Sequence, residues 1–299
     1  MFRFVLILNL ILSYSFSAGS VFNYGTNAKE VSLSGATISM QNAGFNSFNN
    51  PAFISHTKAV EYGMSYFKMS LDRSIHSFSY SRKISNDAGI GLSFFMASVD
   101  DIVQTDLDNN SFGNLDYWEG FGAMSFSIKS NNLSSGITLK VYQSNLHNYK
   151  ADAIGADIGF NYKVNEKSNV AFCYKNIGAK YNWDFNYDED IENVLSAGYN
   201  YKHNNNLNFL FQFDNIGEYN KSKIGIEYSP LKNLKLRGGW KYSSNYGQVE
   251  DTSNLYYLGF SYSFIIFQES FLTLDYALDP GLMDEGMSHL FSFSTKINP

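Results

Sequence analysis

The stretch AIGADIGFNYKV, residues 153–164, decides the fold because its apolar and polar residues alternate one by one. Ile154, Ile158 and Phe160 fall on one face of an extended chain, whereas Asp157 and Lys163 fall on the other. A period of two is that of a β-strand rather than of a helix. The stretch therefore predicts a strand with one apolar and one polar face.

The same alternation continues on both sides of this stretch, from residue 58 to the end of the chain. It recurs, for example, in LNFLFQFD at 207–214 and in LKLRGGWKY at 234–242. Counting such segments predicts fourteen strands of roughly ten residues each, which is about the length that crosses a bilayer when tilted. Helical periodicity of comparable strength is absent from the sequence.

Alternation alone does not distinguish a soluble sandwich from a membrane barrel, but two further features favour the barrel. The polar faces are small as well as polar, as in Ser77, Ser79 and Ser81. The joins between strands also alternate in length, which is typical of an up-and-down outer-membrane barrel with short periplasmic turns. Tight turns are expected near Ser85, Asn131, Glu166, Asn204 and Pro230, and long loops at 99–118, 146–152, 176–192, 243–254 and 279–286.

The chain is therefore interpreted as an all-β protein, a 14-stranded antiparallel transmembrane β-barrel with an N-terminal plug segment, in contact with outer-membrane lipid. Residues 1–18 are typical of a signal peptide, with an apolar run followed by small residues near Ser17 and Ala18. A buried strand or an uncleaved anchor is the alternative. Residues 19–57 are expected to fold as a plug, or else to form a periplasmic linker, and residues 58–299 to form the barrel.

Composition excludes several classes of function. The chain has 22 basic and 28 acidic residues and a net charge of −6, so it lacks the excess of positive charge that nucleic-acid binding requires. Its single cysteine, Cys173, cannot form a disulfide within the chain, and no cofactor or metal motif occurs. Five scattered histidines give little support to catalysis. His76 is the one catalytic candidate, because it falls on the lipid-facing side of a serine-rich strand, where an outer-membrane lipid hydrolase would hold its catalytic residues. Such an enzyme would need a serine within hydrogen-bond reach of His76.

The N-terminal part resembles the PorV/PorQ family of outer-membrane proteins, a branch of the FadL-like barrels. The resemblance rests on YG at 24–25, LSGA at 33–36 and NNPA at 49–52, with Gly35, Asn50, Pro51 and Ala52 as the plug motif. An Asn-Ile-Gly element that ends a strand at 176–178 and again at 215–217 adds to it.

This resemblance implies an accessory of type IX protein secretion, which would contact a secretion channel or cargo protein through its loops and plug. It implies a protein that is not an enzyme. The alternative is a FadL-like passive transporter of a hydrophobic small molecule. An apolar pocket over the plug would favour transport, whereas exposed aromatic loop tips and a closed wall would favour the adaptor.

Strand parity predicts which charged side chains point into the lumen. They are Glu61, Lys140, Asp157, Lys163, Lys202, Lys223, Glu227, Lys235, Arg237, Lys241 and Asp275. The lumen is thus expected to be basic, and the acidic residues to lie mostly in the long loops. Either these charges attract a carboxylate or phosphate headgroup, or they hold the plug through ion pairs.

Overall fold

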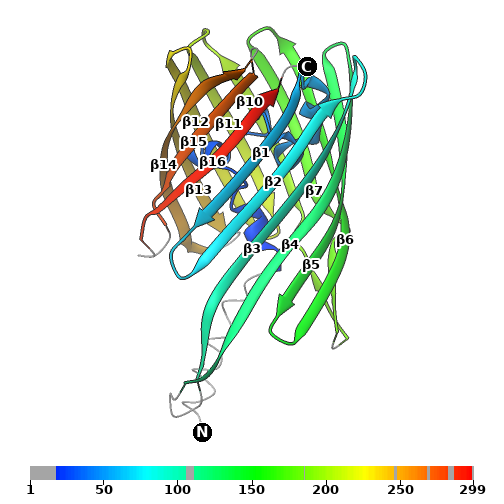
Figure 1. The fold of residues 1–299 in the computed structure, drawn as a ribbon, viewed down its shortest axis with the longest axis vertical. Coiled ribbons are helices and arrows are strands. Elements are labelled where there is room, and N and C mark those ends of the chain that lie inside the picture. Colours follow the sequence, from blue (N-terminus) through cyan, green and yellow to red (C-terminus); the bar gives the residue numbers. More distant parts are fainter. Residues whose placement is uncertain are drawn as a thin grey trace.

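The computed structural model describes residues 18–105, 111–184, 186–245, 248–267, 270–281 and 286–297, which form a barrel of tilted strands (Figure 1). The strands are β1 (Val60–Lys68), β2 (Arg73–Lys83), β3 (Ala88–Thr105), β4 (Ser111–Ser130), β5 (Leu133–Leu146), β6 (Tyr149–Asn165), β7 (Ser168–Ile177), β8 (Lys180–Trp183), β9 (Tyr187–Asp190), β10 (Val194–Lys202), β11 (Leu207–Ile216), β12 (Tyr219–Leu231), β13 (Leu234–Asn245), β14 (Gln248–Phe267), β15 (Ser270–Asp279) and β16 (Ser288–Ile297).

The sheet closes on itself. Each barrel strand pairs with antiparallel neighbours on both sides, and β1 pairs with β16 to join the ends of the chain. The short hairpin of β8 and β9 is an addition that pairs only with the end of β6. The remaining fourteen strands make the wall, so the predicted all-β, fourteen-stranded antiparallel barrel is confirmed.

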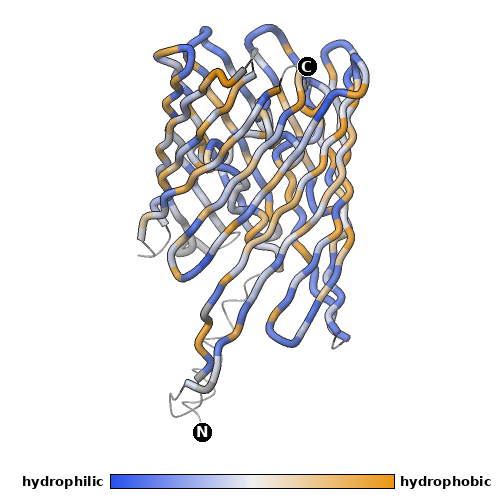
Figure 2. The backbone as a smooth tube through the Cα atoms, in the orientation of Figure 1, coloured by the Kyte–Doolittle hydropathy of each residue, from blue (hydrophilic) through white to orange (hydrophobic). Residues whose placement is uncertain are grey.

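The alternation of the sequence becomes an alternation of environment across this wall. Outward residues such as Ile154 and Leu139 are 72% and 60% exposed, although both are strongly apolar. Ser77, Ser79 and Ser81 are buried on the inner face. Apolar positions run along the strands while both ends of the barrel are mainly hydrophilic (Figure 2). A sheet crosses lipid as a closed barrel with an apolar outer belt, because closure leaves no backbone group unpaired. This protein has that form and is an outer-membrane barrel.

The two ends of the barrel differ. We call the end with the joins 84–87, 131–132, 166–167, 203–206 and 232–233 the short-turn end, and the opposite end the long-strand end. At the long-strand end the hairpin of β3 and β4 extends well beyond the rest of the wall (Figure 1). Because periplasmic turns are short and outer segments longer in such barrels, we expect the short-turn end to face the periplasm.

Several of the predicted long loops are wrong in extent. The predicted loop 146–152 shrinks to a turn of two residues between β5 and β6, and most of 99–118 and 243–254 belongs to strands. Segment 176–192 contains β8 and β9 rather than an irregular loop. These parts of the sequence lose their apolar alternation because they leave the lipid, yet their backbones remain paired.

Residues 18–57, here called the N-terminal segment, lie inside the barrel (Figure 1). The segment contains η1 (Ser20–Asn23), α2 (Ala28–Ser32), α3 (Asn46–Asn49) and η2 (Pro51–His56). Its backbone is held by inward side chains from distant strands: Ser292 Oγ accepts from Ala28 N at 3.0 Å and Gln212 Oε1 accepts from Ile38 N at 3.1 Å. None of the helices in the described residues is long and apolar enough to cross a membrane. The predicted signal peptide falls almost wholly on residues 1–17, outside the described part.

Because the outward side chains face lipid, we expect the loss of stability caused by an outward-facing charge to depend on its depth in the membrane. We expect Leu139→Arg, in the middle of β5, to lower the free energy of unfolding by about 2–4 kcal/mol, because it places a cation in hydrocarbon. Tyr149→Arg, at the long-strand end of β6, is the matched control and should cost at most about 1 kcal/mol. Urea unfolding in lipid vesicles measures both, and equal costs would contradict an outward Leu139.

Candidate functional site

The Asn-Pro-Ala motif of the N-terminal segment lies against the inner wall. The Asn50 side chain caps η2 by accepting a hydrogen bond from Ala52 N at 3.0 Å, and Pro51 is the first residue of that helix. The Asn50 amide nitrogen donates to Ile38 O at 2.9 Å and to Phe160 O on β6 at 3.2 Å. One side chain therefore starts a helix and also connects it to the barrel.

The wall makes room for this motif with glycines. A Cβ on Gly136 would lie 2.5 Å from Pro51 C, and one on Gly159 would lie 2.1 Å from Asn50 Oδ1. Neither distance is possible for a real side chain, so the backbone of the motif rests directly on β5 and β6. Gly35, the remaining motif residue, has a φ of +83° and lies beside Lys223.

Ion pairs connect neighbouring strands inside the lumen. Arg237 is central, with Nε 2.8 Å from Glu227 Oε2 and Nη1 2.7 Å from Asp275 Oδ1. Both carboxylates are buried together with it. Removing such a guanidinium would leave two buried carboxylates without their main partner, so this group stabilises the wall from β12 to β15.

A second ion pair anchors the bulge where β7 ends. Lys140 Nζ lies 2.8 Å from Asp157 Oδ2, and Asp157 Oδ1 accepts from Asn176 N at 2.9 Å. The side-chain oxygen Oδ1 of Asn176 accepts from Lys140 Nζ at 3.2 Å and from the Tyr142 hydroxyl at 2.9 Å. The first Asn-Ile-Gly element thus has a structural role: its asparagine, at φ 61°, fixes the point at which the chain leaves β7.

The other predicted lumen charges have different surroundings. Lys163, Lys202 and Lys235 line a cavity at the short-turn end, whereas Lys223 and Lys241 border a small pocket beside Tyr24. Glu61 is fully buried and accepts from Gly44 N at 3.1 Å rather than from a lysine. The predicted charges therefore do not converge on one centre.

Sequence reasoning missed two partners of this set. Asp214 is buried and pairs with Lys223 at 2.5 Å, and its inward position follows from the alternation of Phe211 and Phe213 on the same strand. Lys29 belongs to the N-terminal segment, where no strand parity could place it. Burial lowers the pKa of Lys29 to about 8, with Glu227 opposing that decrease and Lys235 adding to it.

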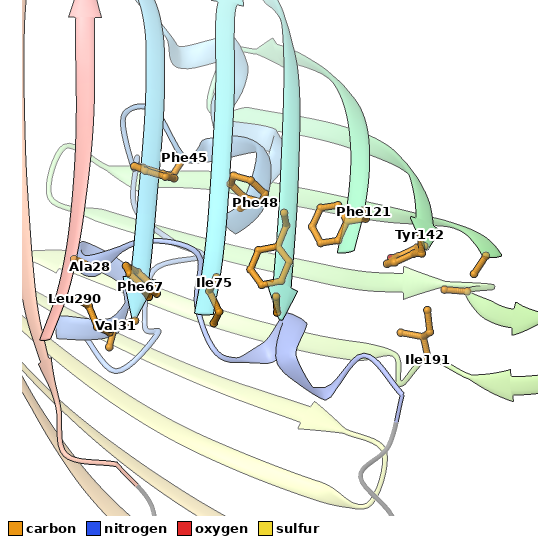
Figure 3. Packing of buried hydrophobic residues seen from close by; sticks show 14 of the residues in the cluster. Ala28, Val31, Phe45, Phe48, Phe67, Ile75, Phe121, Tyr142, Ile191 and Leu290 are labelled. Carbon is orange, nitrogen blue, oxygen red and sulfur yellow. The ribbon is translucent and has the colours of Figure 1, made fainter. Parts of the chain in front are cut away.

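An aromatic cluster lies in the lumen toward the long-strand end. Phe95, Phe121 and Tyr142 are register neighbours on β3, β4 and β5 and all point inward. Phe22 of the N-terminal segment packs among them, with ring centroids 5.6, 5.3 and 5.5 Å away respectively. Figure 3 shows Phe121 and Tyr142 projecting from the wall toward the N-terminal segment. We call these four residues the aromatic cluster.

The described part of the lumen has its large cavity at the opposite, short-turn end. This cavity has a volume of about 1330 Å³ and is lined by the N-terminal segment and by the turns of that end. Its lining contains seven lysines and two glutamates. The lumen thus carries the aromatic cluster toward one end and the lysine-lined cavity at the other.

The catalytic hypothesis for His76 depends on its nearest hydroxyl. Ser74 Oγ lies 3.5 Å from His76 Nε2, longer than the 2.6–3.2 Å of a nucleophile and its base. The same oxygen is 2.9 Å from Ser98 Oγ, while the His76 ring packs on Tyr66. The described residues contain no cluster of His, Cys, Asp or Glu that could hold a metal ion. Cys173 is buried against Asn49.

The glycine contacts predict how the N-terminal segment can be released. Gly136→Ala should push Pro51 off the wall, so that the N-terminal segment becomes at least several-fold more sensitive to protease while the barrel stays folded. Limited proteolysis with mass spectrometry of residues 18–57 measures this. Gly122→Ala is the control, because its Cβ would meet nothing within 4 Å. Equal sensitivity of the two variants would contradict the contact.

Because Arg237 forms two buried ion pairs, we expect its loss to destabilise the barrel more than the loss of the neighbouring cation Lys235. Arg237→Met should destabilise the barrel by about 3–5 kcal/mol, because Glu227 and Asp275 stay buried without it. Lys235→Met removes a cation that contacts the same Glu227 but whose side chain is 40% exposed, so it should cost at most about 1 kcal/mol. Urea unfolding in vesicles tests both, and similar costs would refute the central role of Arg237.

Comparisons with known proteins give a fold but no sequence family. No family model and no curated protein matches the chain. Among solved structures it is similar to the toluene transporter TodX of Pseudomonas putida, with a TM-score of 0.69 and 14% identity over 92% of this chain and 99% of that one. The toluene transporter TbuX of Ralstonia pickettii gives a TM-score of 0.67 and 11% identity over 92% and 99% of the two chains.

A FadL homologue of Pseudomonas aeruginosa is similar as well, with a TM-score of 0.64 and 13% identity over 91% of this chain and 98% of that chain. Two of these neighbours are described as toluene transporters, and none of the three is described as an enzyme. None of the three is described as a PorV or PorQ protein, so the comparisons do not support that resemblance or a role in type IX secretion. The chain has the fold of the FadL-like fourteen-stranded outer-membrane barrels.

Proposed function

We propose that the protein is a passive conduit for small hydrophobic molecules across the outer membrane. The observation that carries this proposal is the aromatic cluster, because the lumen of a water-filled porin is polar. Phe95, Phe121 and Tyr142 instead present adjoining aromatic faces to the interior. Such a surface gains free energy by binding an apolar molecule that leaves water.

Phe22 occupies the position that such a molecule would take. Its ring lies edge-on to Phe95 and Phe121, at interplanar angles of 75° and 74°. Aromatic pairs of this geometry contribute about 0.5–1.5 kcal/mol each beyond the burial of their area. A small apolar ligand could replace these contacts one for one, so the exchange of Phe22 for ligand needs little net free energy.

The N-terminal segment acts in this proposal as the plug of the conduit. Its hydrogen bonds to β4, β11 and β16 span the lumen from side to side. The lumen charges serve to hold the plug and the wall. The fold shared with toluene transporters and a FadL homologue supports a hydrophobic rather than an ionic solute.

The second candidate is an adaptor that binds other proteins through its outer end. Two observations favour it: pairing along the wall is continuous apart from bulges, and Tyr149 and Tyr187 at the long-strand end are 50% and 56% exposed. The extended β3 and β4 hairpin also projects from that end (Figure 1). An adaptor of secretion would use this surface and would need no movement of Phe22.

Uptake of a labelled hydrocarbon separates the two candidates. We expect cells that carry the protein in their outer membrane to take up labelled toluene faster than cells without it, and Phe22→Ala to raise that rate several-fold, because the mutation empties the aromatic cluster. Phe121→Ala should change uptake as well, because it removes part of the binding surface.

Phe53→Ala is the matched control, since Phe53 is a buried ring of the same segment that packs near His56 at the short-turn end. It should leave uptake within about two-fold of the unmodified protein. No uptake by any form, with the barrel folded in the membrane, would reject the conduit and leave the adaptor.

A further inference from the structure

The cavity at the short-turn end concentrates positive charge in a protein that is acidic overall. The chain carries a net charge of −6, yet the cavity lining has seven lysines, Lys29, Lys58, Lys163, Lys167, Lys202, Lys232 and Lys235, and two glutamates. Low-dielectric walls lined by one sign of charge focus the electric field and attract counter-charged molecules. The cavity is therefore suited to an anionic occupant.

Most of these lysines are not engaged with carboxylates of the protein. Lys163 pairs with Glu166 and Lys235 with Glu227. Within the described part of the chain, no carboxylate lies in ion-pair distance of the ammonium groups of Lys58, Lys167 or Lys232, all of which are exposed. Their charge is available to a molecule that enters the cavity.

The distribution of the lysines argues for an extended occupant. Lys29 comes from the N-terminal segment and Lys58 from the join before β1, and the other five come from the β6–β7 and β12–β13 hairpins and from the end of β10. They therefore surround a cavity of about 1330 Å³ instead of meeting at a point. None of the arginines among the described residues lines the cavity. Arginine forks suit compact bidentate recognition of a phosphate, whereas dispersed lysines act as separate point charges.

The remaining lining is rich in side-chain amides. Eight carboxamides line the cavity: Gln41, Asn161, Asn169, Asn200, Asn204, Asn205, Asn206 and Asn208. Asn205 and Asn206 among them are exposed, so their amide groups are open to a molecule in the cavity. Carboxamides offer both donors and acceptors, which match the N–H and C=O groups of an extended polypeptide backbone, whereas a fatty carboxylate carries no N–H donor.

The occupant has to come from another molecule. The acidic residues that this chain has in abundance, such as Asp116, Asp184 and Asp188, belong to the long-strand end, on the other side of the membrane. The short-turn end is expected to face the periplasm. From the lysines, the carboxamides and this position, we propose that the cavity binds an acidic, extended polypeptide segment of a periplasmic protein.

Binding of defined polymers to the purified full-length protein in a non-ionic detergent tests this proposal. Fluorescein-labelled decaglutamate should bind, with fluorescence anisotropy as the readout, and decaglutamine should not. The triple substitution Lys58→Gln, Lys167→Gln and Lys232→Gln should weaken decaglutamate binding roughly ten-fold or more, because it removes three of the seven lysine charges that line the cavity. Added salt should weaken binding further.

The matched control removes three cations from the same end that do not line the cavity, through Arg82→Gln, Lys83→Gln and Lys129→Gln. It should bind decaglutamate within about two-fold of the unmodified protein. If both triple variants lose decaglutamate binding equally, overall charge rather than the cavity accounts for the effect, and the proposal is overturned.

Two competitors distinguish a polypeptide from other anions. Polyacrylate of matched charge lacks backbone N–H groups and should compete less well than unlabelled decaglutamate, and inorganic phosphate should compete no better than chloride at equal ionic strength. Stronger competition by either one would assign the cavity to a different anion. These experiments measure only peptide binding, so they test this proposal independently of the proposed function, which hydrocarbon uptake tests.

Discussion

Hydrocarbon offers no water to backbone N–H and C=O groups, and the rest of this structure depends on that constraint. A sheet can satisfy it only by closing, and here the pairing of β1 with β16 completes the circle. Closure in turn dictates the alternation of side chains, with Leu139 and Ile154 facing lipid and Ser77, Ser79 and Ser81 facing inward. The apolar outside and the small, polar inside are two consequences of one requirement.

A wall of fourteen strands encloses more space than its own side chains fill, so the interior needs further structure. The N-terminal segment provides it, resting on the glycines of β5 and β6 through Asn50 and Pro51. Its two halves meet different surroundings. Phe22 lies among aromatic rings toward the long-strand end, while Lys29 and His56 line the basic cavity at the short-turn end. One segment thereby contacts both the aromatic cluster and the lysine-lined cavity.

Strand parity assigns charged residues to the inner face where the alternation is strict. Glu227, Arg237 and Asp275 could be placed on the inner face from sequence, and they lie there as one ion-paired group. Parity could not indicate that Arg237 binds both carboxylates while Glu61 meets only the N-terminal segment, because partners depend on strand tilt and register. It also could not find Lys29, which lies outside any strand. The predicted long loops failed for a related reason: polar hairpins beyond the lipid keep their pairing without an apolar signature.

The sequence by itself determined the class of fold, the number of wall strands and the side of each strand that meets lipid, because a period of two is a local property of the chain. Only the tertiary structure decided that Phe22 enters the aromatic cluster and that lysines from five separate segments surround one cavity. Those arrangements join residues far apart in the chain, and they arise from closure of the barrel around the N-terminal segment, which no local pattern encodes.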